Sequence, residues 1–127
     1  MEDNASTVRI EPIPGYNALR MTWHHEPASD DAKAAFQQII DYLDKAEAKV
    51  NIVVDVQSDP QFPLGTTLSG ATRPHTHPRM GRWLVIGDNR LVQLIGNALN
   101  TLSDEKILWF STEEEALVHL QSIEQGA

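Results

Sequence analysis

The sequence contains no cysteine, and this absence excludes several kinds of chemistry. Without cysteine, a chain cannot form disulfides, bind zinc or iron–sulfur clusters through thiolates, or use a thiol nucleophile. Basic residues are also few, with 10 Lys and Arg against 18 Asp and Glu and a formal net charge of -8. Because nucleic acids and anionic membrane surfaces are bound mainly through Lys and Arg, this charge disfavours both as partners.

Long hydrophobic runs are missing as well. No stretch approaches the roughly 18 consecutive apolar residues of a membrane span, and residues 1–6 lack the basic start and apolar core of a signal peptide. We therefore expect a cytoplasmic protein with no membrane span. The length of 127 residues predicts one domain, at 7–124, with flexible ends at 1–6 and 125–127.

Apolar residues follow strand-like patterns in five segments. Residues 8–11 and 19–24 alternate apolar and polar side chains, and the short link between them favours an antiparallel pair. The other three segments are continuous apolar runs, typical of parallel strands covered on both faces: residues 50–56, 83–86 and 107–110. We expect the strand at 50–56 to be central, with Asp55 at its end bonding the following turn.

Apolar residues at helical spacing predict four helices. Ser29 is placed to cap the first of them, and Ser111 and Thr112 form a capping-box signature with Glu114 and Glu115 before the last. A short second helix is expected within residues 65–73, because Pro74 should stop it. The third carries its apolar positions between residues 91 and 102.

The resulting order is β-β-α-β-α-β-α-β-α. Strands that alternate with helices imply right-handed crossovers and a mainly parallel sheet. We therefore expect an α/β fold in which helices pack on a mixed sheet with one antiparallel edge strand.

This order, with the strand Ile52-Val53-Val54-Asp55-Val56 leading through a polar loop into a short helix, resembles the STAS domain of anti-sigma-factor antagonists, which has the SpoIIAA-like fold. The run from His77-Pro78 through the strand at 83–86 and Gly87 into the following helix is similar to small stand-alone bacterial STAS-like proteins of unassigned function. The resemblance covers nearly the whole chain and implies a single STAS-like binding domain.

Relatives that regulate sigma factors carry Asp-Ser-Ser-Gly or Asp-Ser-Thr-Gly at the start of the second helix, where a serine accepts phosphate. The matching stretch here is Phe62-Pro63-Leu64-Gly65-Thr66, and the phosphoacceptor position falls on or next to Gly65. The resemblance thus implies a binding domain without the usual phosphoacceptor motif. Nearby hydroxyls such as Thr66 are interpreted as helix caps.

His75 and His77 are the strongest candidates for chemistry, because two histidines at i and i+2 of an extended segment could ligate a metal. No His-Glu-x-x-His motif or carboxylate cluster accompanies them, and Arg73 and Arg79 would repel a cation. Exposed histidines in a proline-stiffened loop are the favoured interpretation, and a metal-dependent enzyme ranks third among the functions. With no nucleophile elbow either, we expect no catalytic residue, no cofactor and no metal.

The first hypothesis is a non-catalytic domain that binds a protein partner, not yet identified, through the loop after Asp55 and the short helix. Apolar side chains would supply contact area, and hydroxyls and an arginine would orient the partner. The candidate residues are Phe62, Leu64, Thr66, Thr67 and Arg73. Basic residues Arg73, Arg79 and Arg82 gather around this region, so an anionic group would meet the least repulsion there.

The alternative is a protein that binds a small-molecule or lipid-like ligand in a pocket between the sheet and residues 57–79. The length of that segment motivates it. A homodimer stays open under both hypotheses, because an exposed edge strand would need cover.

Overall fold

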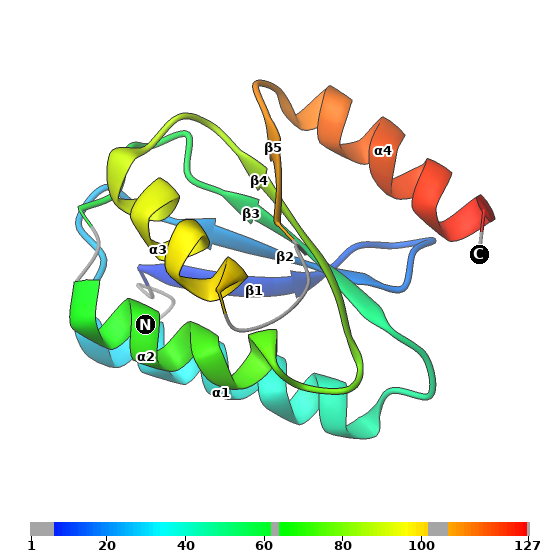
Figure 1. Ribbon diagram of the computed structural model, residues 1–127, viewed down its shortest axis with the longest axis horizontal. Coiled ribbons are helices and arrows are strands. Elements are labelled where there is room, and N and C mark those ends of the chain that lie inside the picture. Colours follow the sequence, from blue (N-terminus) through cyan, green and yellow to red (C-terminus); the bar gives the residue numbers. More distant parts are fainter. Residues whose placement is uncertain (1–6, 62–63, 102–106, 127) are drawn as a thin grey trace, which may run out of the picture.

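The computed structural model describes residues 7–61, 64–101 and 107–126, and over them the expected β-β-α-β-α-β-α-β-α order is present (Figure 1). Phe62 lies outside the described residues, and so does the side chain of Leu64. None of the helices in the described part of the chain combines the length and apolar character needed to span a bilayer.

Five strands form one sheet in the order β1-β2-β3-β4-β5, so neighbours in the sequence are also neighbours in space. The strands are β1 (Val8–Pro12), β2 (Ala18–Trp23), β3 (Val50–Asp55), β4 (Met80–Ile86) and β5 (Ile107–Phe110). β1 is antiparallel to β2, and the remaining pairs are parallel. The expected antiparallel edge strand and the central position of β3 are both confirmed.

Three helices cover one face of this sheet and the fourth covers the other (Figure 1). The helices are α1 (Ser29–Lys45), α2 (Leu64–His75), α3 (Arg90–Asn100) and α4 (Glu113–Gly126). Each parallel crossover advances one strand in the same direction, and because crossovers share one hand, α1, α2 and α3 fall on the same face. Helix α2 packs between α1 and α3, while α4 packs against β3, β4 and β5 from the opposite side.

The two faces of the sheet form two apolar clusters that meet at β3. Ile52 and Val54 point toward the three-helix face, and Val53 points toward α4. All three are buried, as the continuous apolar run of this strand predicts.

The start of α1 differs from the expectation, and the capping role given to Ser29 is wrong. Ser29 is the first helical residue, and Ala28 precedes it with no side-chain cap. Instead, Thr7 Oγ1 accepts a bond from the Ala28 N–H at 2.8 Å and donates to Asp31 Oδ2 at 2.7 Å. The Thr7 N–H also donates to Asp31 at 2.8 Å, and these two bonds lower the pKa of Asp31.

The capping box before α4 is confirmed. The Glu115 N–H donates to Thr112 Oγ1 at 3.2 Å, and the Ser111 N–H donates to Glu115 Oε1 at 3.1 Å. These bonds satisfy two backbone donors at the helix start, and the Glu115 carboxylate reaches the residue before Thr112.

Helix α2 runs two residues further than expected, through Pro74 to His75. Pro74 has no N–H to donate to the Gly70 carbonyl, and the helix ends one residue later. The interpretation of both histidines as exposed is wrong for His75, which is 0% exposed and accepts a bond from Trp83 Nε1–H at Nδ1, at 3.1 Å. This bond fastens the end of α2 to β4.

Helix α4 is bonded at its start to β2 and at its end to the residue that precedes β2. Arg20 on β2 donates two bonds to the Glu113 carboxylate, at 2.7 and 3.0 Å. At the other end, Glu124 accepts a bond from the Asn17 N–H at 3.0 Å. The bond from Arg20 lowers the pKa of Glu113 below its ordinary value.

Glu113→Gln should lower the free energy of unfolding by about 0.5 kcal/mol at neutral pH, as for a partly exposed ion pair. Because the folded-state pKa of Glu113 is lowered, its contribution is complete above the unfolded pKa and disappears as the pH falls through the folded pKa. Urea unfolding is measured for Glu113→Gln and for the wild type from neutral pH to about pH 3, and the difference between their free energies of unfolding should shrink as the pH falls. Exposed Glu114→Gln is the control, and a Glu113→Gln deficit that persists in acid would contradict the assignment.

Candidate functional site

Helix α2 separates two spaces, and the candidate residues divide between them. Thr66 and Arg73 face a surface groove beside α1. Thr67 is 3% exposed and faces a cavity against the sheet. Two of the expected contact residues therefore lie together, and a third lies on the opposite side of the same helix.

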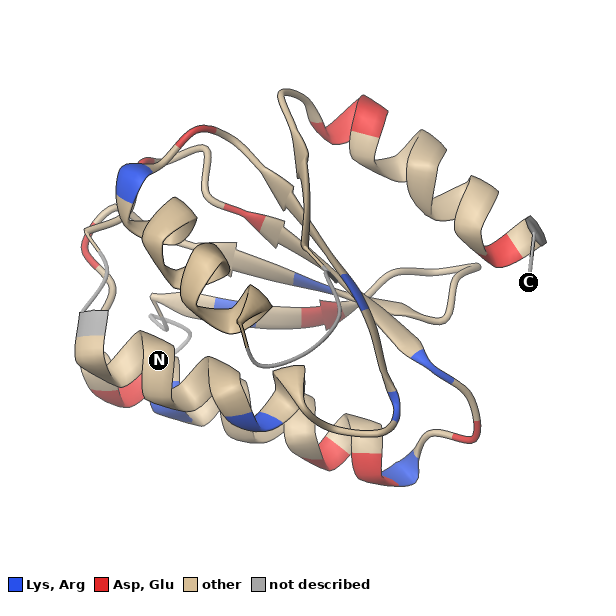
Figure 2. Ribbon diagram, viewed as in Figure 1, with Lys and Arg blue, Asp and Glu red and all other residues tan. Residues whose placement is uncertain are grey.

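The groove between α1 and α2 encloses about 520 Å³. Phe36 and Ile40 supply its apolar part, and its polar and small residues are Lys33, Gln37, Gly65, Thr66, Ser69, Gly70 and Arg73. Two cations and no carboxylate are among these residues. Figure 2 shows acidic residues toward both ends of α1, so the groove lies between them.

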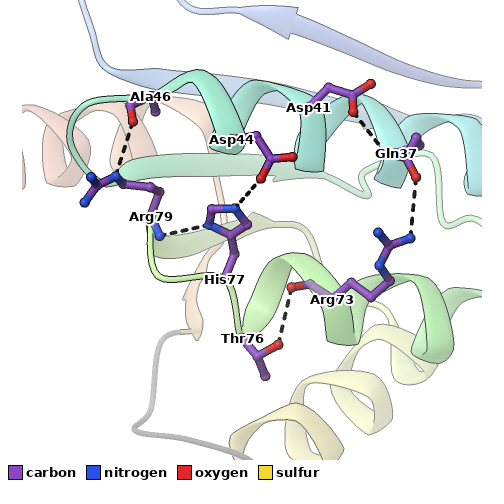
Figure 3. A network of polar contacts seen from close by, with 8 residues as sticks. All are labelled: Gln37, Asp41, Asp44, Ala46, Arg73, Thr76, His77 and Arg79. Atoms are coloured by element: carbon purple, nitrogen blue, oxygen red, sulfur yellow. Dashed lines mark hydrogen bonds and ion pairs between the residues drawn. The ribbon is translucent and has the colours of Figure 1, made fainter.

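The two cations of the groove retain most of their donors. Among the described residues, the Arg73 guanidinium makes one long bond, of 3.4 Å from Nη1 to Gln37 Oε1, and Gln37 in turn donates to Asp41 Oδ1 at 3.0 Å (Figure 3). A guanidinium has five N–H donors, so most of those on Arg73 are available to a partner. Lys33 has no ion-pair partner among the described residues.

His77 ties the segment after α2 to the end of α1 (Figure 3). Its Nδ1 accepts a bond from the Arg79 N–H at 3.0 Å, so Nε2 carries the proton and donates to Asp44 Oδ1 at 2.8 Å. Both ring nitrogens are therefore engaged, which leaves neither to act as a base or a metal ligand. Within the described ranges, no three His, Asp or Glu side chains are grouped so that they could hold a metal ion.

The other basic residues expected near Arg73 point elsewhere. Arg79 Nε donates to the Ala46 carbonyl at 3.2 Å, beyond the end of α1, and Arg82 lies on β4. Only Arg73 of the three lines the groove.

The carboxyl ends of the parallel strands, where open α/β sheets commonly bind ligands, are occupied by the protein's own bonds. Asp55 Oδ1 accepts a bond from the Gln57 N–H at 2.9 Å, which confirms its expected structural role. Buried Asn89 donates to Asp59 Oδ1 at 2.9 Å and to the Pro60 carbonyl at 3.0 Å. Its own Oδ1 caps α3 by accepting from the Val92 N–H at 3.0 Å.

The cavity lies between the sheet and helices α1, α2 and α3, and its lining surface is apolar, that of Thr67 included. Its volume is about 50 Å³. Thr67 Oγ1 is buried and has no hydrogen-bond partner in the described part of the chain. Trp109 on β5 is 42% exposed and is the one exposed residue of the described wall, so the cavity opens beside it.

Sequence inspection did not identify the contributions of α1 and α3 to these two spaces. Lys33 and Gln37 lie one helical turn apart on the polar flank of the α1 apolar stripe, a signal that could have placed them beside α2. Gly96 lies within the buried stripe of α3, and a Cβ there would be 3.0 Å from the Trp109 ring. A glycine inside an apolar stripe indicates such a close approach.

The arrangement of strands and helices is similar to a known crystal structure. It is that of an uncharacterised protein of the DUF3478 family, with a SpoIIAA-like fold, from Shewanella loihica PV-4. The TM-score is 0.63 over 94% of this chain and 98% of that chain. The chain has a SpoIIAA-like fold.

This result confirms the STAS-like fold expected from the order of elements. Sequence identity across the SpoIIAA-like match is 16%, so the likeness concerns the fold. No protein-family model matches the sequence, and no curated protein matches it either.

Gly70→Ala should reduce the free energy of unfolding by about 1–2 kcal/mol through overpacking. A Cβ at Gly70 would stand 2.5 Å from the Phe36 ring, which borders both the groove and the cavity. Gly65→Ala in the same helix is the matched control, because a Cβ there meets nothing within 4 Å. Chemical denaturation compares the two, and equal stabilities would contradict the close packing of α2 on α1.

Thr67→Val should raise the free energy of unfolding by about 1 kcal/mol, because it removes a buried hydroxyl that has no partner. Thr66→Val, the same substitution one residue earlier on the groove side, should change stability by less than about 0.5 kcal/mol. Urea unfolding curves decide the comparison. A Thr67→Val protein less stable than the wild type would show that the hydroxyl is already satisfied.

Proposed function

We propose that the protein is a non-catalytic binding domain that recognises a protein partner through the groove between α1 and α2. The observation that carries this proposal is a groove lined by two cations and no carboxylate, on a protein with a net charge of -8. Charge complementarity there favours a carboxylate on the partner.

The groove residues would act in two ways. Phe36 and Ile40 offer apolar contact area, while Lys33 and Arg73 would hold a carboxylate from two sides. The acidic remainder of the surface would repel a strongly acidic partner. The expected partner segment therefore carries one or two Asp or Glu side chains on an otherwise neutral or basic surface.

The proposed binding is that of a domain without the usual phosphoacceptor serine motif. Gly65 stands in the first turn of α2, on or next to the position where relatives carry a phosphoacceptor serine, and it has no hydroxyl.

Lys33→Glu combined with Arg73→Glu should abolish capture of the partner, because both contacts to its carboxylate become repulsive. The experiment is affinity capture from an extract of the source cells, with quantitative mass spectrometry. Arg90→Glu with Lys49→Glu, an equal charge change at exposed positions outside the groove, is the control. A protein that is captured equally by the wild type and by both double variants is not bound through the groove. Such a result would reject the groove as the partner-binding site.

A second candidate function is the binding of a small apolar ligand. The cavity between the sheet and α2 favours it, because the lining surface of that cavity is apolar. The two functions use different sides of α2.

A further inference from the structure

We infer that the open edge of β5 binds an extended, basic segment of a protein partner, which adds to the sheet as a further strand. The inference goes beyond the proposed function and concerns a different surface. β5 and α4 lie apart from α1 and α2 (Figure 1), and no residue lines both the groove and the depression beside β5.

The two edges of the sheet differ in their protection against pairing with another chain. β1 carries Arg9 and Glu11, which form an ion pair of 3.3 Å, and it ends in Pro12. Charged side chains and proline are common means of keeping an edge strand from pairing. β5, with the sequence Ile-Leu-Trp-Phe, has neither. Its edge is therefore available to a further strand.

The backbone of β5 directs hydrogen-bonding groups away from the sheet. The Gly87 N–H donates to the Phe110 carbonyl at 3.0 Å, so the backbone groups of Phe110 face β4. Because this direction alternates along a strand, the N–H and the carbonyl of Trp109 face the open side. β5 is the last strand of the sheet, and no backbone group in the described part of the chain pairs with these two. An added strand would satisfy both of them.

The side chains next to this edge are acidic and apolar. A depression between β5 and α4 contains Phe110 and Val118, and Val118 is 63% exposed. Glu114 and Glu115 line the same depression, in the acidic first turn of α4 (Figure 2), and α4 has no Lys or Arg. On the other face of the sheet, the Trp109 side chain is half-exposed.

These surroundings define the chemistry of the bound segment. The side chains of an added strand alternate between the two faces of the sheet. On the α4 face they are Lys or Arg, whose charged ends meet Glu114 and Glu115 and whose methylene stems cover Val118. On the other face they are apolar and pack against Trp109.

A second copy of this chain fits the edge less well. Antiparallel pairing of two β5 strands across a two-fold axis would place both α4 helices on one face of the joined sheet. The first turns of these helices are acidic, so the pairing would bring like charges together. Charge complementarity therefore favours a basic partner.

The experiment records backbone amide signals by nuclear magnetic resonance while the full chain is titrated with a capped peptide of alternating Lys and Val. The amides of Trp109 and Val118 should shift, and that of Gly70 beside the groove should not. Glu114→Lys should weaken binding about tenfold, because it places a cation against the lysines of the peptide. Glu47→Lys, the same charge change at an exposed position outside the depression, is the control and should bind as the wild type.

Two methylated versions of the peptide separate strand addition from charge attraction. One is N-methylated at every Lys and the other at every Val, and both keep the charge of the parent peptide. In an added strand, the amides of only one residue type face β5. One version should therefore bind as the parent does, and the other should not bind.

Equal binding of the two methylated peptides would overturn the inference, because no strand would then be added to the sheet. The same holds if no amide shifts with up to about 1 mM peptide, or if the shifts lie outside β5 and α4. A Trp109 amide shift that depends on the concentration of the chain alone would assign the edge to a second copy and would also overturn it. The capped peptide has no carboxylate, so none of these results bears on the groove proposal.

Discussion

The rest of the structure depends on one topological constraint: every parallel crossover advances by one strand in the same direction. Crossovers of one hand then place α1, α2 and α3 on the same face, and α2 lies between the other two. The middle helix must present an apolar side to the sheet and can keep a polar side toward solvent. The cavity and the groove are the two sides of that single helix.

One aromatic ring connects these two sides. Phe36 lines both the groove and the cavity. The backbone of Gly70 lies so close to the Phe36 ring that a Cβ at this position would overlap the ring. A ligand in the cavity and a partner in the groove would therefore contact opposite sides of the same side chain. The geometry gives the two proposed sites a shared physical element without requiring either to depend on the other.

The order of elements could be predicted from the sequence because apolar periodicity reports local structure, as the run at 50–56 and the stripe of α1 do. Features that depend on contacts between residues far apart in the sequence could not be predicted in this way. Thr7, and not Ser29, bonds the start of α1, through Asp31, which is 24 positions away in the sequence. His75, which follows Pro74, is still part of α2 and bonds Trp83 on β4. In the same way, Arg73 and Thr66 were identified from α2, whereas Lys33 was missed because it belongs to a helix some 30 residues earlier.

Hydrogen–deuterium exchange on the chain alone and with its captured partner tests the central claim most directly, because it maps the contact surface without altering any residue. The account predicts slower exchange along the groove, at residues 33–40 of α1 and 65–73 of α2, with little change in α4. Slower exchange confined to β5 and α4, with α1 and α2 unchanged, would contradict it.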